Sequence, residues 1–586
     1  MKRKYTTCLR AAAQIVLAAL ITAGLILITW SASPSSRRVL HVLTTGDVHG
    51  RWFDSCYVEP GVRNSLQNVS WYVDSVRNAA GEENVLLLDA GDILQGDNCT
   101  YYYNFVDTAC VHPMARILKY MRYDAVAVGN HDIETGHRVY DRFSADMKRL
   151  GIQFLGGNAL NASGDPYFPE YKLFRRAGMK VLVLGYTNAN IKAWLTESLW
   201  SGMSFESLVP YVNSRVELLR AATKPDVVIV LMHSGTGDGD GRVLENQGLD
   251  LLDSVKGVDL VICGHDHRSR IIRRPGCCLV NGGSHASSIG HCTLTLEGNG
   301  AAKTVTADAS LIKVNTDRVD GAMVKKFHPE YLAVKSFTER KVGSLTVPLY
   351  TRESYRGMCD YMNLIHTVQL MATGADVSFA APLTYDGTIN GGKVLYNDLF
   401  KIYPYENQLF KVRMTGRQIK DYLEYSYNLW IGGEDGHVLK IHKNPDERTG
   451  ASGWSFDNRS YNFDSASGLL YHVDVFAPMG ERVVIESFAD GSDFDPEGSY
   501  TVAMTSYRAS GGGGTIINGA GIPADELDGI VVDRYPEIRD LIYDFFKSNI
   551  LVSSELTDDR ELLGFWLFTG DGAAERIDAD MKLLFD

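Results

Sequence analysis

The chain has 586 residues, of which 45% are apolar and 10% aromatic. That length exceeds one ordinary domain and supplies enough apolar side chains for two or three packed cores, so we expect at least two domains. The formal net charge of -13 argues against a general nucleic-acid surface, which needs a basic face to displace counterions from phosphates. A small phosphorylated ligand stays open, because a metal site brings its own positive charge.

Residues 1–36 differ in composition from the rest of the chain. An uncharged run over residues 11–30 follows four basic residues, Lys2, Arg3, Lys4 and Arg10. This order is typical of an export signal, in which the positive residues stay in the cytoplasm and the bulk of the chain crosses the membrane. The run is long for a cleaved signal, so a removed signal and membrane attachment through residues 11–30 both fit. In either case the working domains are predicted to be extracytoplasmic, in the periplasm or at the cell surface.

Eight of the nine cysteines lie beyond this segment, so compartment and parity both permit disulfides. Their pairing cannot be deduced from the spacing. No CxxC pair occurs in the sequence, which argues against a structural zinc cluster.

From residue 37 to about residue 313, apolar strand-like runs alternate with amphipathic segments, which predicts an α/β fold with strands buried on both faces. Five of the runs, at residues 39–45, 85–88, 126–129, 227–232 and 260–263, are followed by side chains that bind metal ions or transfer protons. In chain order these side chains are Asp47 and His49, Asp92, Asn130 and His131, His233, and His265 and His267. Because ligands are best presented just past the carboxyl end of a strand, we expect the five loops to converge on one site.

The residue types in these loops suit a pair of divalent ions. Mn, Zn, Fe, Co and Mg accept carboxylate oxygen and imidazole nitrogen, and two such ions can share a bridging carboxylate and a bridging hydroxide. Asp92 is a suitable bridge and Asn130 a neutral oxygen ligand, and the set is completed by Asp47, His49, His233, His265 and His267. His131 is then available to donate a proton or to stabilise charge on a phosphoryl group. Asp89 and Asp132 are expected to hydrogen-bond loop amides or imidazoles rather than to bind metal.

The second half of the chain begins with a polar segment, residues 316–344, that we interpret as an interdomain connector. A second domain is predicted over residues 345–550, with helices at 360–373 and 417–430 and strands at 470–476, 482–486 and 500–505. Arg352 and Arg356 are four apart, a spacing that suits contact with a substrate phosphate or carboxylate. Residues 551–586 form a tail whose role the sequence does not indicate.

The five ligand loops resemble the five motifs of the calcineurin-like metallophosphoesterases. In chain order they are GDVHG (46–50), GDILQG (91–96), GNHD (129–132), the lone His233 and GHDH (264–267). From about residue 37 to 546 the chain resembles the secreted two-domain 5'-nucleotidases of that superfamily. The resemblance implies a four-layer metallophosphatase β-sandwich flanked by helices over residues 37–315, followed by an α+β nucleotide-binding domain. It also implies one ion held by Asp47, His49, Asp92 and His267, and another held by Asp92, Asn130, His233 and His265.

The resemblance further implies that a carboxylate orients His131. In 5'-nucleotidases an aspartate stands three residues after this histidine, whereas here the position is Glu134. A glutamate has the longer reach, and Glu134 is predicted to orient His131.

Two segments of the second domain resemble the family's base-binding segments, in which two aromatic rings sandwich the base. They are YPYEN (403–407) and TSYRASGG (505–512), which place Tyr405 and Tyr507 as the rings and Asn407 as the amide that touches the base. Stacking is worth about 1 to 3 kcal/mol per base and tolerates any base. The alternative for both tyrosines is ordinary core packing.

The two tyrosines and the YNFD block (461–464) are more similar to 2',3'-cyclic-nucleotide 2'-phosphodiesterase/3'-nucleotidases than to 5'-nucleotidases. Asp386 also stands where the latter have an arginine. The sequence therefore predicts metal-dependent hydrolysis of nucleotide phosphoesters by either activity, with a hinge near the connector that brings the base and the metals together. A UDP-sugar or sulfur-ester hydrolase on the same fold and a cell-surface binding protein without turnover remain alternatives. Metal identity and oligomeric state stay open.

Overall fold

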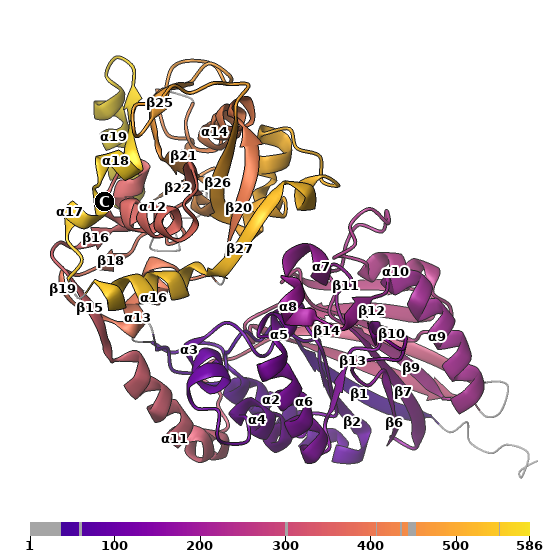
Figure 1. Cartoon of the computed structure of the whole chain (residues 1–586). Helices are drawn as coiled ribbons and strands as arrows, with labels where there is room; N and C mark the ends of the chain where they lie inside the picture. The colour runs from indigo at the N-terminus through magenta and orange to yellow at the C-terminus, as the bar shows by residue number, and fades with distance from the viewer. Residues whose placement is uncertain are drawn as a thin grey trace, which may run out of the picture.

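A computed structural model describes residues 37–57, 61–298, 303–405, 407–433, 436–443, 453–549 and 551–586. The segment expected to direct export, residues 1–36, lies outside these ranges. Among the helices that are described, none combines the length and apolar character that a membrane crossing requires. Figure 1 shows two units, one indigo to magenta and one orange to yellow, joined along one side by α11 (Gly321–Thr338).

The first unit is built on two six-stranded sheets with the orders β14-β13-β1-β2-β3-β4 and β11-β12-β10-β9-β7-β6. The first contains β1 (Arg38–Thr45), β2 (Val85–Asp89), β3 (Ala125–Ala127), β4 (Gln153–Leu155), β13 (Ser288–Glu297) and β14 (Thr304–Lys313). The second contains β6 (Tyr171–Arg176), β7 (Met179–Tyr186), β9 (Val227–Met232), β10 (Leu260–Cys263), β11 (Ser269–Arg274) and β12 (Cys277–Gly282). In each sheet the central strands run parallel, which places their carboxyl ends at one edge.

The two sheets pack face to face and helices cover their outer faces, giving four layers (Figure 1). Val42 of β1 and Ile229 of β9 both belong to the buried apolar cluster between the sheets. Over the first sheet lie α2 (Leu66–Ala80), α4 (Pro113–Met121) and α6 (His137–Leu150), and over the second lie α9 (Leu208–Thr223) and α10 (Gly248–Ser254). Strands buried on both faces are continuously apolar, as in the VVIVLM of β9. The expected four-layer sandwich is confirmed.

The second unit centres on a five-stranded sheet with the order β23-β17-β26-β20-β27. These strands are β17 (Val377–Ala380), β20 (Gln408–Thr415), β23 (Ser465–Ser467), β26 (Ser499–Thr505) and β27 (Val531–Glu537). One face carries α12 (Asp360–Thr373), α13 (Tyr396–Ile402) and α16 (Ile538–Ser548), and the other carries α14 (Gly416–Trp430). Along β26, Ala503 faces the first group while Val502 and Met504 face α14, as the alternation of a strand requires. The α+β architecture expected here is confirmed.

Residues 551–586 complete the core of the second unit rather than trailing from it. Strand β28 (Gly564–Thr569) pairs in parallel with β24 (Leu469–Asp474), which also pairs with β25 (Val483–Phe488). Helix α19 (Ala573–Phe585) buries Ile577 and Met581 in the core that α14 also lines. Asp580 accepts hydrogen bonds from the backbone N–H groups of Val438 and Leu439 at 2.8 and 2.9 Å. The tail is therefore an integral part of this unit.

The connector carries α11, which has more apolar anchors than its polar sequence suggests. Met323 and Phe327 are buried in the core of the first unit, whereas Phe337 belongs to the core of the second. The guanidinium of Arg340 lies over Phe337, 3.8 Å from the ring centroid. From Lys341 the chain is already strand β15 (Lys341–Leu345), paired with β19 (Gly392–Leu395). The domain boundaries at residues 315, 344 and 550 stay predictions.

Candidate functional site

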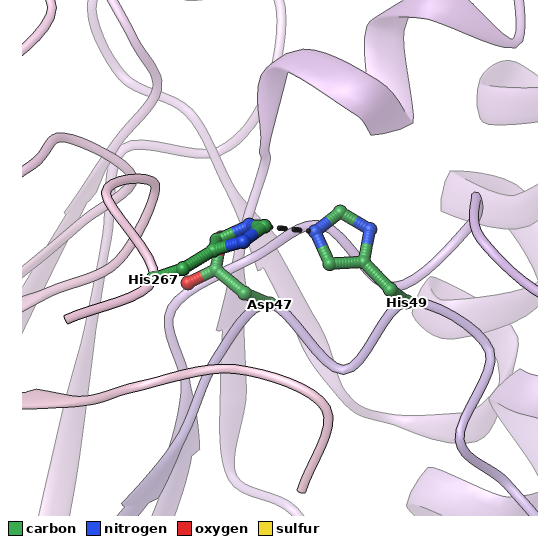
Figure 2. A group of neighbouring side chains, drawn as sticks. All are labelled: Asp47, His49 and His267. Carbon is green, nitrogen blue, oxygen red and sulfur yellow. Dashed lines mark hydrogen bonds and ion pairs between the residues drawn. The ribbon is translucent and has the colours of Figure 1, made fainter. Parts of the chain in front are cut away.

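The loops that follow β1, β2, β3, β9 and β10 meet at one edge of the two sheets. Ligand atoms of Asp47, His49 and His267 lie within 4.8 Å of one another, and so do those of Asp47, Asp92 and His233. Figure 2 shows the imidazoles of His49 and His267 facing each other beside Asp47. Because Asp47 belongs to both groups, the two groups are continuous.

The nitrogen and oxygen atoms of these side chains lie close enough to one another to bind the same cations. The Nε2 atoms of His49 and His267 are 3.0 Å apart, and His267 Nε2 lies 3.5 Å from Asp47 Oδ1. Oδ2 of Asp92 lies 3.1 Å from His233 Nε2 and 3.9 Å from His49 Nε2, so this carboxylate reaches both groups. His233 directs its other nitrogen, Nδ1, to the carbonyl oxygen of Ala90 at 2.8 Å, which leaves Nε2 toward the cluster.

Asn130 and His265 complete the cluster. Oδ1 of Asn130 is 2.9 Å from His233 Nε2 and 2.9 Å from His265 Nδ1. The backbone N–H of His265 donates to both carboxylate oxygens of Asp47 at 3.0 Å. The structure thus brings together all seven side chains that the sequence singles out as metal ligands.

One buried atom indicates what the cluster holds. Oδ2 of Asp92 is buried and meets no hydrogen-bond geometry among the described residues, although Nε2 of His233 lies 3.1 Å away. A buried carboxylate needs positively charged partners, and a cation would supply one. Carboxylate, imidazole and amide oxygen are also the donor types that divalent transition metals and magnesium accept. The residues present therefore fit divalent cations.

The pKa values of the histidines in the cluster differ because their electrostatic surroundings differ. Burial alone would raise the pKa of Asp92, but the imidazoles of His233, His131 and His49 hold it well below its usual value. Burial likewise opposes protonation of His233, yet the carboxylates of Asp92 and Asp47 raise its pKa to about 9. Burial lowers the pKa of His49 to about 3, so this ring is neutral near pH 7 and presents a lone pair.

The loop backbones are held in conformations that side-chain-bearing residues rarely adopt. Asp47, His49, Asp92, His265 and His267 have φ values of 48°, 46°, 59°, 76° and 56°. Each such residue costs on the order of 1 to 3 kcal/mol, and these conformations cluster at functional sites. Gly129 is required for a different reason, because a Cβ there would lie 2.0 Å from Asp92 Oδ1.

Asp132 and Asp89 hold the loops in place, as expected, rather than pointing at the cluster. Asp132 accepts four backbone N–H groups, those of Gly129, Asp92, Ile93 and Leu94, at 2.8 to 3.1 Å. Asp89 accepts from Thr45 Oγ1 at 2.5 Å and from the Gly91 N–H at 2.9 Å. Burial raises the pKa of Asp132 to about 6 and that of Asp89 to about 7.

His131 lies beside the cluster on the short helix α5 (Asn130–Glu134). Its backbone N–H donates to Asp92 Oδ1 at 2.9 Å, and its ring centroid is 5.4 Å from that of His49. Nδ1 of His131 is 2.5 Å from Glu134 Oε2. The glutamate therefore reaches the imidazole from the position at which the resemblance implies an aspartate.

A cavity of about 260 Å³ in the second unit holds the predicted base-binding residues Tyr405, Asn407 and Tyr507. This volume is close to the lower end of small-molecule sites, about 300 to 1,000 Å³. The two tyrosines are 46% and 45% exposed, so core packing does not explain them. Tyr461 joins them in the cavity wall, with its ring centroid 6.3 Å from that of Tyr405.

Each of the two units matches a known protein family. Residues 40–269 match the family described as calcineurin-like phosphoesterase, and residues 341–519 match the 5'-nucleotidase, C-terminal domain. The chain is a metallophosphoesterase of the 5'-nucleotidase family.

Individual proteins similar to this phosphoesterase share few identical residues with it but match most of its length. A 2',3'-cyclic-nucleotide 2'-phosphodiesterase/3'-nucleotidase of Haemophilus influenzae is 23% identical over 542 residues, which cover 80% of each chain. The trifunctional nucleotide phosphoesterase protein YfkN of Bacillus subtilis is 22% identical over 88% of this chain, which spans only 38% of that protein. The crystal structure of a candidate 5'-nucleotidase from Staphylococcus aureus shares the fold, with a TM-score of 0.71, 19% identity, and coverage of 90% of this chain and 99% of that one.

Arg508 of the phosphoesterase, to which sequence reasoning gave no role, ties the cavity walls together. Its buried guanidinium donates to Asp464 Oδ2 at 2.8 Å, Asn462 Oδ1 at 3.0 Å and the Tyr461 carbonyl at 2.6 Å. These bonds join the TSYRASGG and YNFD segments, which explains why both blocks mark the same pocket. The pairing itself spans more than forty residues and leaves no local signal.

Glu245 of the phosphoesterase, also without a predicted role, lies beside the metal cluster. Its Oε2 lies 3.6 Å from Nε2 of His265, whose ring is stacked on Trp194 at 5.2 Å between centroids. Burial raises the pKa of Tyr507, and the Glu245 carboxylate adds to that increase.

Arg352 and Arg356 do not join the cavity, so the structure does not bring these two predicted substrate contacts to the site. Arg352 donates to both carboxylate oxygens of Asp386 at 3.1 and 3.2 Å. Arg356 pairs with Glu353 at 3.6 Å and with Asp578 at 3.5 Å. Their charges are already compensated by carboxylates of the second unit. His285, which the sequence analysis does not single out, lies beside the cluster, 5.4 Å from His49 between ring centroids.

Proposed function

We propose that the phosphoesterase hydrolyses nucleotide phosphoesters outside the cytoplasm with two divalent cations bound in the cluster. One cation is assigned to Asp47, His49, Asp92 and His267, and the other to Asp92, Asn130, His233 and His265. The observation that carries the proposal is the buried Oδ2 of Asp92, which lies 3.1 Å from Nε2 of His233 and 3.9 Å from Nε2 of His49 and so reaches both groups of ligands. Two divalent cations there would lower the pKa of shared water to supply hydroxide at neutral pH and would neutralise charge on the phosphoryl oxygens.

The protein's own side chains supply the remaining steps. Because its backbone N–H is bonded to Asp92 and its ring to Glu134, His131 is held at the edge of the cluster. We assign to it the donation of a proton to the leaving oxygen or the stabilisation of charge on the phosphoryl group. Glu134 is assigned the positioning of that ring.

The second unit is assigned the recognition of the nucleotide. Tyr405 and Tyr507 stack on the base, and Asn407 touches its edge. A hinge near residues 316–344 would then adjust the distance between base and phosphate. The tyrosines at both stacking positions favour 2',3'-cyclic and 3'-nucleotides, with 5'-nucleotides as the second substrate class.

A metal-reconstitution panel tests this function. Protein stripped by a chelator is supplied singly with Mn, Zn, Co or Mg and given 5'-, 3'- and 2',3'-cyclic nucleotides, a UDP-sugar, a thiosulfonate and bis(p-nitrophenyl) phosphate. We expect nucleotide hydrolysis that disappears on chelation and returns with metal. Loss of all nucleotide activity beside hydrolysis of the UDP-sugar or thiosulfonate would assign another ester class, and a metal-loaded protein inert on the whole panel would indicate a binding protein.

His131→Ala separates catalysis from metal binding. Turnover is expected to fall by about 10² to 10⁴, the usual contribution of a general acid, with an unchanged metal content. His137→Ala, on helix α6 with its ring bonded to Asp141 at 3.1 Å, is the matched control and should keep wild-type turnover. Wild-type turnover in the His131 variant would refute the assigned role. Cell fractionation that places the protein in the cytoplasm would refute the assigned location.

A further inference from the structure

The floor of the tyrosine cavity contains a buried amide that is satisfied on one side only. Gln369, on helix α12, is fully buried and lines the cavity together with Tyr405 and Tyr507. Its Oε1 accepts a hydrogen bond from Ser378 Oγ at 2.7 Å. Its Nε2 has no hydrogen-bond partner anywhere in the described ranges of the chain. The Gln369 NH₂ is therefore a hydrogen-bond donor beside the cavity without an acceptor among the described residues.

A chain of hydrogen bonds behind Gln369 is compatible with the orientation in which Ser378 donates to Oε1. His366 Nδ1 is 2.9 Å from Ser378 Oγ, and His366 Nε2 is 3.3 Å from Ser465 Oγ. Burial lowers the pKa of His366 to about 3, so the ring is neutral and carries a single N–H. When Ser378 donates to Gln369, its oxygen accepts from His366 Nδ1–H, and His366 Nε2 accepts from Ser465. In this arrangement each group donates to the next one toward Gln369, and the Gln369 NH₂ is left without an acceptor among the described residues.

The energetics of an unpaired donor favour a ligand that supplies an acceptor. Leaving a buried N–H unpaired is unfavourable, and a bound acceptor atom would satisfy it. Stacking between Tyr405 and Tyr507 cannot discriminate bases, because every base has a π face. The other amide in the cavity wall, Asn407, already donates from Nδ2 to the Tyr403 hydroxyl at 3.4 Å. Asn407 keeps its Oδ1 and one N–H for the base edge, whereas Gln369 Nε2 has no partner among the described residues, so Gln369 is the cavity amide whose donor still lacks an acceptor.

We propose that Gln369 is a specificity-determining residue whose Nε2–H donates to a carbonyl oxygen at the edge of the base. Bases with a keto group there, such as hypoxanthine, guanine and uracil, are then favoured over bases with an amino group, such as adenine and cytosine. An amino group on the base is also a hydrogen-bond donor, so neither it nor the Gln369 NH₂ would find an acceptor in the other. Ser378 is assigned as the positioning residue that keeps the amide in this orientation. The inference rests on the proposed nucleotide specificity of the same cavity.

Inosine and adenosine 2',3'-cyclic phosphates test the inference, since among their exocyclic groups they differ only at position 6. With the metal-loaded wild type we expect kcat/KM for the inosine substrate to exceed that for the adenosine substrate by about tenfold or more. In Gln369→Leu the ratio should fall to about one. Ser378→Ala, which removes no atom from the cavity wall, should also lower the ratio because the amide is free to turn. Thr367→Val, on the same helix but outside the cavity wall, should keep the wild-type ratio.

Calorimetric binding of the nucleosides inosine and adenosine gives a second readout that does not require turnover. The same tenfold preference is expected in the dissociation constants. A wild-type ratio near one or in favour of adenosine, or a ratio that Gln369→Leu leaves unchanged, would overturn the inference even if nucleotides are hydrolysed. Selective inosine binding without nucleotide hydrolysis would overturn the proposed function and leave the inference intact.

Discussion

Asp132→Asn tests whether one buried carboxylate holds the ligand loops together. Each carboxylate oxygen of Asp132 accepts two backbone N–H groups, from Gly129 and Asp92 on one side and from Ile93 and Leu94 on the other. An asparagine side chain can keep its oxygen on one side only, so two of the four hydrogen bonds are lost. At about 1.5 to 3 kcal/mol for a hydrogen bond to a charged group, the free energy of unfolding should fall by about 3 to 6 kcal/mol.

The measurement is urea-induced unfolding of metal-free protein at pH 8, where the Asp132 carboxyl group, with a pKa of about 6, is ionised. Asp259→Asn is the matched control, because its Oδ2 accepts one backbone N–H, that of Val228 at 2.8 Å, at the opposite end of β10. The control should lose no more than about 1 kcal/mol, since its remaining oxygen can keep that bond. Equal losses in the two variants would refute the reasoning that Asp132 organises the loops.

Three further changes have defined outcomes. Tyr405→Ala and Tyr507→Ala should each weaken nucleotide binding by about 1 to 3 kcal/mol, seen as a KM raised by about 5-fold to 150-fold, with hydrolysis of bis(p-nitrophenyl) phosphate as the internal reference. Glu134→Gln should lower kcat and change its pH profile with little effect on KM, and an unaltered profile would remove Glu134 from its positioning role. Because burial lowers the pKa of His366 to about 3, its contribution to stability is fully present above pH 6.5 and is lost as the pH falls, since only the unfolded chain takes up the proton. That loss should reach about 2 kcal/mol at pH 5 and be absent in His366→Gln, as urea titrations at both pH values can show.

The ligand loops could be predicted because each depends on local sequence. β9 (Val227–Met232) and β10 (Leu260–Cys263) are uninterrupted apolar runs that end at the first polar ligand. The helix expected over residues 360–373 is found with the same bounds as α12, which Gly374 ends with a φ of 57°. When the hydrophobic pattern and the residues that end a helix or strand lie within one segment, the sequence predicts both the element and the ligands that follow it.

The remaining features depend on contacts between distant segments. Arg352 was expected at the substrate, but chain packing brings Asp386 to its guanidinium from 34 residues away. The tail lacks a motif, yet β28 finds its partner in β24, almost one hundred residues earlier. Gln369 lies in a helix that is buried almost throughout, so periodicity does not show which of its residues faces a cavity. Such pairings are set by tertiary structure, which a single sequence does not display.

The central claim is that Asp92 is shared by two cations. Anomalous diffraction from crystals of the manganese-loaded protein tests it most directly. We expect two peaks per chain, one beside Asp47, His49 and His267 and one beside Asn130, His233 and His265, with the Asp92 carboxylate between them. An Asp92→Ala variant should lose both peaks or keep only a weakened one. A single peak, or peaks away from these side chains in active crystals, would contradict the claim.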